Sequence, residues 1–196
     1  QRLREEREQK HRSEYQYERL KQQINPHFLF NSLGILDYLV QEQQTERASA
    51  FIHKLAGMYR YMLSKDTKPL VRLDEELDFV GKYVDLIKER FTEGVVIDID
   101  IPESMYDSSV VPCALQLLVE NATKHNIVSV ESPLVISIAC EAEWIVVRNN
   151  LQQRTHGQPS THLGLENIRR QYQDITGRSI VVEKSESEFI VKLPII

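Results

Sequence analysis

Cysteine is scarce in this 196-residue chain, and long hydrophobic runs are missing. The two cysteines, Cys113 and Cys140, stand apart inside apolar runs, without the spacing of metal ligands. This argues against a disulfide framework and indicates a reducing compartment. No apolar run approaches the ~20 residues that span a bilayer, and no signal-peptide pattern is present. We therefore expect a cytoplasmic domain, connected to a membrane only through a segment upstream of Gln1.

An excess of basic charge is missing too. The net charge is −5, and Lys and Arg are mixed with Asp and Glu, so we expect no nucleic-acid partner. Two phosphate-binding signatures are also absent, the Walker Lys-Ser/Thr pair and G-x-G-x-x-G, which excludes the P-loop and Rossmann classes. The hydrophobic and charged fractions, 41% and 27%, are those of a soluble protein of one to two domains.

The first third of the chain is predicted to be helical. Residues 1–23 are charged and glutamine-rich with few apolar anchors, which indicates a helical connector. Apolar side chains then recur at helical spacing from residue 24 and again over 51–62, after a polar break at 41–47 where Thr45 could cap the second helix. The resulting hairpin, residues 24–66, has more apolar surface than it can cover, so we expect a homodimeric four-helix bundle.

The remaining residues, 67–196, predict an α+β domain. A third helix, capped by Asp74, is expected to end near Gly94, and period-two alternation over 95–101 indicates a strand. Further strands are predicted at 134–140, 144–149, 179–183 and 188–193, with helices near 109–126 and 163–175. This order favours a mixed sheet covered on one face over a doubly wound parallel sheet.

The segment INPHFLFNSL at 24–33 places His27 directly after an Asn-Pro step. A helix either begins there, with Asn25 as N-cap, or kinks there. If it begins there, the positive end of the helix dipole keeps the imidazole of His27 neutral and nucleophilic. The alternative is a core or capping histidine. Asn31, one turn later, could set the tautomer of His27 or could be a surface amide.

Two other segments carry polar groups suited to phosphate. VPCALQLLVENATKHN at 111–126 is an apolar helix that carries Glu120, Asn121 and Lys124 close together, which suits hydrated Mg²⁺ and phosphate oxygens, or equally a helix end with a Glu–Lys pair. After Asn149, a polar loop leads into THLGLENI at 161–168, where a helix opens near Gly164. A loop that feeds a helix N-terminus can cradle phosphate.

Together and in this order, these segments and KYVDLIKERF at 82–91 resemble the LytS-like family of sensor histidine kinases over residues 20–196. The resemblance implies a dimerisation and phosphoacceptor hairpin followed by a Bergerat (GHKL-type) α/β sandwich that binds ATP. It makes His27 the phosphoacceptor, Asn121 the Mg²⁺ ligand, and Glu120 the acid that positions or deprotonates the acceptor. Lys124 and His125 then lie near phosphate.

The resemblance also assigns the rest of the nucleotide site, with departures. Asn149 stands where an aspartate usually accepts the adenine amino group, and Gly164 and Leu165 open the helix that faces the phosphates. Leu151 and His162 stand where the family has glycines. An uncharged amide makes a weaker bond than a carboxylate, by about 1 kcal/mol, so we expect weakened but not abolished ATP binding.

The sequence thus predicts the cytoplasmic core of a bacterial inner-membrane sensor that autophosphorylates on His27 from Mg-ATP. A homodimer is expected to pass the phosphoryl group to an aspartate of a response regulator, and the resemblance implies a regulator of the LytTR type. The alternative is a catalytically weak nucleotide-binding dimerisation scaffold, a pseudokinase. Intact Asn121 favours the kinase, whereas the missing glycines favour the scaffold, and the Glu120–Asn121–Lys124 cluster makes a purely structural coiled-coil adaptor improbable.

Overall fold

The computed structural model describes residues 26–65, 68–152 and 163–196. The chain divides into two compact units, residues 1–64 and 65–196. Among the described residues, no helix combines the length and apolar character needed to cross a membrane. The predicted connector, residues 1–23, lies outside the described residues.

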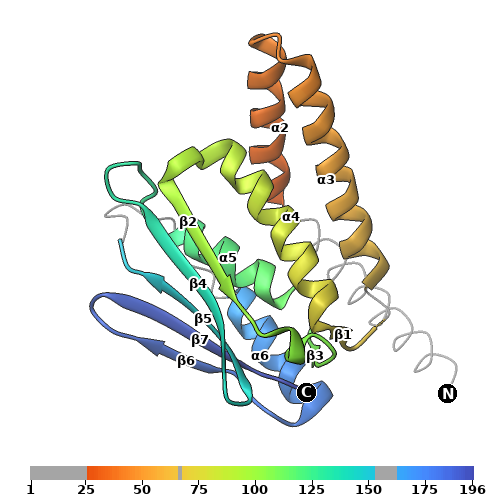
Figure 1. Ribbon diagram of the computed structural model, residues 1–196, viewed down its shortest axis with the longest axis vertical. Coiled ribbons are helices and arrows are strands. Elements are labelled where there is room, and N and C mark those ends of the chain that lie inside the picture. The colour runs from red at the N-terminus through yellow and green to blue at the C-terminus, as the bar shows by residue number, and fades with distance from the viewer. Residues whose placement is uncertain (1–25, 66–67, 153–162) are drawn as a thin grey trace, which may run out of the picture. The chain divides into compact units, whose positions relative to one another are not determined.

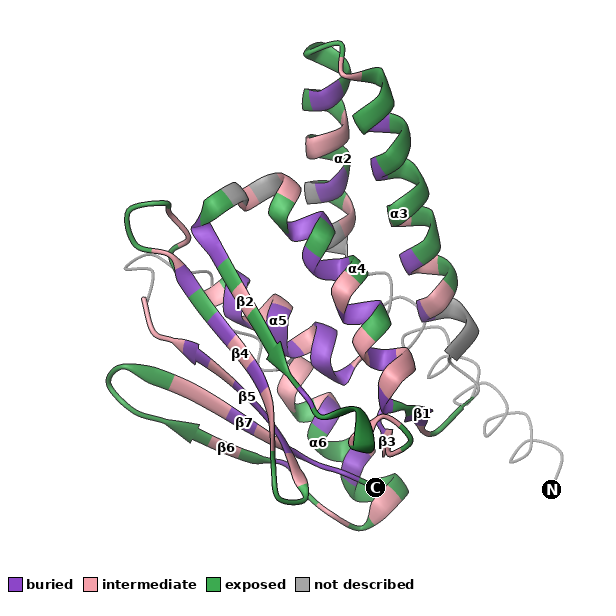
Figure 2. Ribbon diagram, in the orientation of Figure 1, coloured by how far each residue is buried: buried purple, intermediate pink, exposed green. Residues whose placement is uncertain are grey.

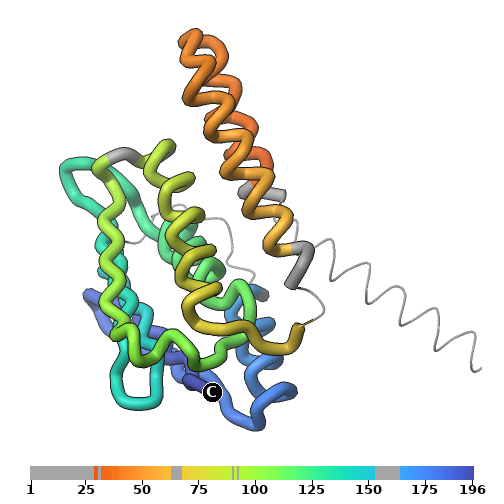
Figure 3. The backbone as a smooth tube through the Cα atoms, turned by 45° about the vertical axis from the view of Figure 1, so that its right-hand side comes forward, coloured from red at the N-terminus to blue at the C-terminus, as the bar shows by residue number. Residues whose placement is uncertain are grey.

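The first unit contains a helical hairpin. Helix α2, Pro26–Gln41, and helix α3, Thr45–Lys65, run antiparallel (Figure 1, Figure 3). The turn between them closes with the Gln44 N–H donating to the Leu39 carbonyl at 2.9 Å, while Gln43 takes a positive φ of 57°. In α3 the buried residues Phe51, Met58 and Met62 follow the predicted helical spacing. In α2 the buried residues are Ser32 and Leu39, and apolar residues of the predicted stripe such as Leu33 and Val40 are exposed. The predicted pair of helices is confirmed, but the predicted buried face of the first helix is wrong.

The predicted cap of the second helix is wrong by one residue. Helix α3 begins at Thr45 itself, and the Gln44 carbonyl accepts the first intrahelical bond, from the Ala48 N–H at 2.9 Å. Gln44 therefore occupies the N-cap position, and its side chain accepts a hydrogen bond from Arg47 at 2.5 Å. Whether a helix begins or kinks at Pro26 depends on residues outside the described ranges.

The second unit is built on a five-stranded mixed sheet in the order β2-β4-β5-β7-β6. Its strands are β2 Val95–Asp100, β4 Leu134–Glu141, β5 Trp144–Asn150, β6 Val181–Lys184 and β7 Glu188–Pro194. Strands β2 and β4 pair in parallel and the other pairs are antiparallel. Helices α4 Leu73–Phe91, α5 Ala114–His125 and α6 Leu163–Thr176 cover one face (Figure 1). The expected mixed sheet with one covered face is confirmed.

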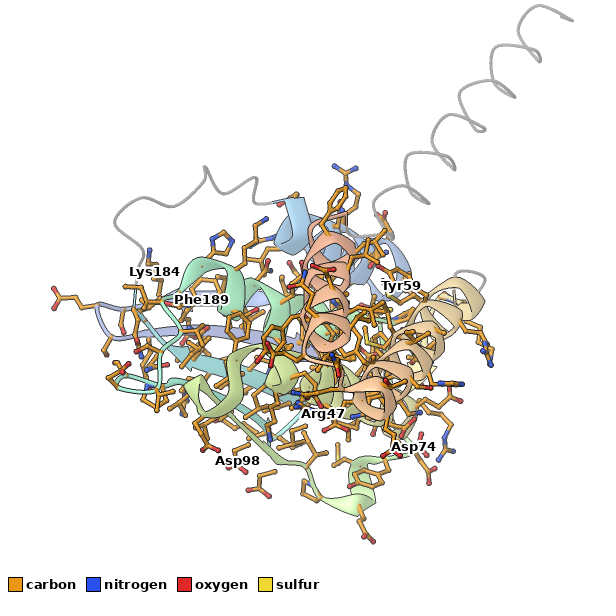
Figure 4. The ribbon with its side chains drawn as sticks, turned by 90° about the horizontal axis from the view of Figure 1, so that it is seen from above. Arg47, Tyr59, Asp74, Asp98, Lys184 and Phe189 are labelled. Carbon is orange, nitrogen blue, oxygen red and sulfur yellow. The ribbon has the colours of Figure 1, made fainter. Side chains whose placement is uncertain are left out.

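The core lies between this sheet and the three helices, because alternate strand residues point to opposite faces. Ile136 and Ile138 of β4, Phe79 of α4 and Leu115 of α5 are among the fully buried side chains. Figure 2 shows buried stretches on these strands and helices. On the other face, Val135 and Asp98 are exposed, and Asp98 points outward in Figure 4. The apolar stripes read from the sequence therefore pack as their spacing predicts.

Two predicted boundaries shift, the first of them because of pairing between distant segments. The helix expected from residue 109 begins at Ala114, since Ser109–Val110 forms strand β3 and pairs with β1, Val71–Arg72. The C-terminal residue extends this pairing, with the Ser109 N–H donating to the Ile196 carbonyl at 2.7 Å. The last strand pair also starts later than expected, at Val181.

Asp74 is not the N-cap of the third helix. Helix α4 begins one residue earlier, at Leu73, so Asp74 lies in its first turn, where its carboxylate accepts the Glu75 N–H at 2.8 Å. Asp74 also accepts two hydrogen bonds from Arg72, at 3.0 and 2.8 Å. These bonds hold the pKa of the Asp74 carboxyl below its ordinary value. Helix α4 ends at Phe91 and is followed by a 3₁₀ turn, Thr92–Gly94, close to the predicted end.

Candidate active site

Helix α5 presents the predicted polar cluster on an otherwise buried helix. Its apolar residues face the core, and those that are buried are Ala114, Leu115, Leu118, Val119 and Ala122. Glu120 and Asn121 are half-buried at the edge of this face, and Lys124 is exposed one turn further on. His125, the last residue of the helix, is half-buried. The helix thus carries an acid, an amide and an ammonium group at its C-terminal end.

A buried glutamine, which the sequence analysis did not single out, contacts the acid of this cluster. Gln116 is 3% exposed, and its Nε2 donates a hydrogen bond to Glu120 Oε2 at 2.9 Å. Among the described residues, Gln116 Oε1 has no hydrogen-bond partner. A buried amide oxygen without a partner costs free energy, about 1–3 kcal/mol, and a role in catalysis or ligand binding is one explanation for such a group. The signal available in the sequence was the four-residue spacing from Gln116 to Glu120, one helical turn.

The glycine of LGLENI lies against the asparagine of the α5 cluster. A Cβ atom placed on Gly164 would lie 3.6 Å from Asn121 Nδ2 and 3.7 Å from Asn121 Oδ1. Gly164 is the second residue of α6, so the N-terminal turn of that helix reaches the Asn121 amide. Two motifs more than forty residues apart in the sequence therefore lie side by side. Leu165, the next residue, is half-buried.

Asn149 lies at the end of β5, with its side chain on the covered face of the sheet. It is 5% exposed, and its Nδ2 donates to the Asn150 carbonyl at 2.7 Å. Within the described residues this is the one hydrogen bond recorded for that side chain. Because the amide nitrogen donates to this carbonyl, the side-chain oxygen is the atom suited to accept a hydrogen bond from a donor such as an amino group.

Side-chain amides tie the residues after β5 to the loop after α5. The Gln152 N–H donates to Asn126 Oδ1, and the Ile127 N–H donates to the Gln152 carbonyl, both at 2.8 Å. Asn150 accepts from the Val135 N–H at 2.8 Å. These bonds hold the end of β5 beside the C-terminal end of α5. The position of His162, where a family glycine was expected, lies outside the described residues.

The phosphoacceptor candidate lies in the other unit. His27 is the second residue of α2, and Asn31 is one turn further along the same helix. The structure describes the backbone of His27 and Asn31 but not their side chains. The structure thus brings together Asn121 and Gly164, with Glu120 one residue away, and it leaves the roles of His27 and Asn31 as predictions.

Comparison with known proteins shows similarity to histidine kinases. A family model described as histidine kinase matches residues 15–95. The sensor protein LytS of Staphylococcus saprophyticus is 33% identical over 106 residues, which is 54% of this chain and 18% of that protein. The sensor histidine kinase BtsS of Escherichia coli is 33% identical over 103 residues, 53% of this chain and 18% of that protein.

A longer match is to an uncharacterized sensor-like histidine kinase of Staphylococcus epidermidis, 31% identical over 170 residues, 78% of this chain and 32% of that protein. The chain thus spans between 18% and 32% of the length of these relatives. Similar solved structures include the cytoplasmic segment of histidine kinase QseC, 15% identical with a TM-score of 0.46, covering 76% of this chain and 92% of that one. The histidine kinase AdeS of Acinetobacter baumannii is 14% identical with a TM-score of 0.44, covering 86% and 97%.

These relatives and the order of the four sequence segments lead to one assignment: the chain belongs to the LytS-like family of sensor histidine kinases.

Proposed function

We propose that this chain is the kinase core of a sensor histidine kinase, which transfers the γ-phosphoryl group of ATP to His27 and then to an aspartate of a response regulator. The observation that carries the proposal is the contact between Gly164 and Asn121. It joins a helix N-terminus, which favours negative charge, to an amide that can bind a metal ion. Both groups come from segments that resemble nucleotide-site motifs of the family.

The residues at this contact fit Mg²⁺ and a nucleoside triphosphate. Hard divalent cations take oxygen ligands, and Asn121 supplies an amide oxygen beside the Glu120 carboxylate. A glycine at position 164 leaves room for phosphate to approach the backbone of α6, room that a Cβ would fill. When bound, Mg²⁺ supplies neutralisation of the charge on the phosphate oxygens. Lys124, exposed near the same helix end, adds positive charge.

The remaining roles are those that the family resemblance implies, and the chemistry of the polar side chains suits them. Asn149 Oδ1 accepts a hydrogen bond from the adenine amino group, since Asn149 Nδ2 donates to the Asn150 carbonyl. An imidazole nitrogen of His27 attacks the γ-phosphorus in line, and the bond to the leaving ADP oxygen breaks. Glu120 takes the imidazole proton or orients the ring, and Gln116 holds the Glu120 carboxylate in place. Asn31 sets the tautomer of His27, and His125 and Leu165 complete the surroundings of the phosphates.

The exposed apolar residues of the hairpin support a homodimer. Phe30 and Tyr38 are 72% and 58% exposed, and Leu33, Val40 and Ile52 are exposed as well. A hairpin with this much exposed apolar surface buries it when a second copy adds two more helices. We therefore propose a dimeric four-helix bundle with domain limits near 24–66 and 67–196. We also propose a cytoplasmic location beside a bacterial inner membrane and a response regulator of the LytTR type.

The test is to incubate the chain with γ-labelled ATP and Mg²⁺ and to measure acid-labile, alkali-stable label. We expect label in the wild type, none in His27→Gln, and at least a tenfold loss in Asn121→Ala, about what one lost charged contact costs. His53→Gln is the matched control, because His53 is an exposed histidine of the same hairpin whose hydrogen bond within the described residues is to the Ser49 carbonyl of its own helix. Gln173→Ala, exposed on α6, serves the same purpose for Asn121.

The alternatives give different results. Label that survives His27→Gln overturns the assignment of the phosphoacceptor. An unlabelled wild type that still binds a fluorescent ATP analogue is a scaffold instead of a kinase. A chain that neither takes up label nor binds the analogue overturns the proposal as a whole.

A further inference from the structure

The N-terminal end of α5 is capped by a carboxylate from a different helix. The residue before α5, Cys113, has φ 61° and ψ 10° and makes no side-chain cap hydrogen bond. Glu76 of α4 takes that role: its Oε2 accepts the Cys113 N–H at 3.0 Å and its Oε1 accepts the Leu115 N–H at 3.1 Å. Glu76 is 0% exposed. Both of its oxygens therefore bind donors that a helix start leaves unpaired.

A second helix contacts the same end of α5. Tyr172 of α6 is fully buried, and its hydroxyl accepts the Val111 N–H at 3.4 Å. Burial, together with the nearby charge of Glu76, raises the pKa of Tyr172, so the hydroxyl stays neutral. The segment that leads into α5 is thus held from α4 on one side and from α6 on the other. We call Glu76 and Tyr172 the α5 anchor.

We propose that the α5 anchor is a pair of positioning residues, which sets the rotation and the axial position of α5 and so places Glu120 and Asn121 opposite Gly164. The proposal rests on the proposed function for its kinetic consequence. Asn121 lies about 9 Å along the helix from Leu115, at about 1.5 Å per residue. A rotation of about 10° moves a side-chain tip that is about 5–6 Å from the axis by about 1 Å.

A displacement of this size is large for a catalytic group, since about 1 Å can cost up to about a hundredfold in rate. The anchor acts at the far end of α5, so neither Glu76 nor Tyr172 needs to touch the nucleotide. Because Tyr172 belongs to the same helix as Gly164, the anchor also links the two sides of the candidate site. A slip of α5 relative to α6 therefore changes the contact at Asn121.

The experiment compares Glu76→Gln and Tyr172→Phe with Val191→Ala, a buried control on β7 whose apolar side chain makes no hydrogen bond. Amide hydrogen exchange is measured without nucleotide in α5, over residues 120–123, and in β2, over residues 95–100, a strand that does not pair with β7. We expect the ratio of α5 to β2 exchange to rise about tenfold in Glu76→Gln and by less in Tyr172→Phe, since a bond to a charged group is worth more than a neutral one. The control should leave the ratio unchanged.

Autophosphorylation supplies the second readout, well below the melting temperature of each variant. We expect kcat to fall about tenfold or more in Glu76→Gln and to stay within about twofold in Val191→Ala. If Glu76→Gln does not fold, the exchange ratio and kcat of Tyr172→Phe test the proposal instead. The proposal is overturned if the exchange ratio is unchanged in the anchor variants, or if kcat falls equally in the control. If the wild type takes up no label, the proposed function fails, and the exchange ratio alone decides the anchor.

Discussion

The contact between Gly164 and Asn121 predicts that Gly164→Ala raises stability while it weakens nucleotide binding. The added Cβ would lie 3.6 Å from Asn121 Nδ2 and 3.7 Å from Oδ1, which are ordinary van der Waals distances. The backbone at Gly164 is outside the left-handed region, so alanine fits without strain. The substitution therefore changes two things only, the entropy of the unfolded chain and the space beside Asn121.

The two effects have opposite signs and separate magnitudes. Alanine in place of a helical glycine stabilises the folded state by about 0.5–1 kcal/mol, which raises the melting temperature of a domain of this size by about 2–5 °C. The methyl group also occupies the space through which phosphate approaches the N–H groups of α6. Loss of one charge-assisted hydrogen bond costs about 1.5–3 kcal/mol, or about 10- to 100-fold in Kd.

Calorimetry measures both quantities on the same protein, by thermal scan and by titration with Mg²⁺ and a non-hydrolysable ATP analogue. Gly81→Ala is the matched control, because Gly81 lies in the middle of α4 with no atom within 4 Å of a built Cβ. We expect the control to raise the melting temperature similarly and to leave Kd unchanged. An unchanged Kd in Gly164→Ala refutes phosphate binding at Gly164, and a lower melting temperature refutes the steric argument.

Three further predictions follow from the same structure. Gln116→Leu should lower kcat about tenfold with little change in the KM for ATP, because it removes the hydrogen-bond donor to Glu120. The free energy of unfolding should change little, because the substitution also removes a buried oxygen without a partner among the described residues. A KM for ATP that rises about tenfold would contradict this prediction. Tyr38→Asp should raise the dimer Kd at least about tenfold by light scattering, because Tyr38 is exposed on the hairpin, and a dimer of unchanged strength would place the interface elsewhere. The pKa of Tyr172 is raised in the folded state, so its contribution to stability is fully present below the ordinary tyrosine pKa of about 10 and is lost as the pH rises above it. Urea unfolding of the wild type should therefore lose more stability above pH 10 than Tyr172→Phe does, and parallel curves would show that Tyr172 titrates normally.

Local patterns in the sequence were sufficient for most elements of this fold, although they missed the short strands β1 and β3. The helical spacing from Phe51 to Met62 and the alternation over 95–101 predicted a helix and a strand that the structure contains, because each pattern reports how its own segment is buried. The same holds for α5, whose apolar face and polar end were visible as VPCALQLLVENATKHN. Errors occurred where a segment depends on a distant partner, as at Ser109, which pairs with Arg72 and with the C-terminal Ile196.

What only the tertiary structure decided is how the parts of the site are held together. No spacing rule connects Glu76 to the start of α5, because its backbone partners lie 37 and 39 residues away. The residue before the helix, Cys113, makes no side-chain cap hydrogen bond, and nothing in the sequence shows which residue supplies the cap. Nor does any pattern in the sequence show that Gly164 lies beside Asn121. The sequence by itself determined the family, the elements and the identity of the candidate groups, since these are properties of single segments. Their mutual placement depends on packing of α4, α5 and α6 against one sheet, which is a property of the whole unit.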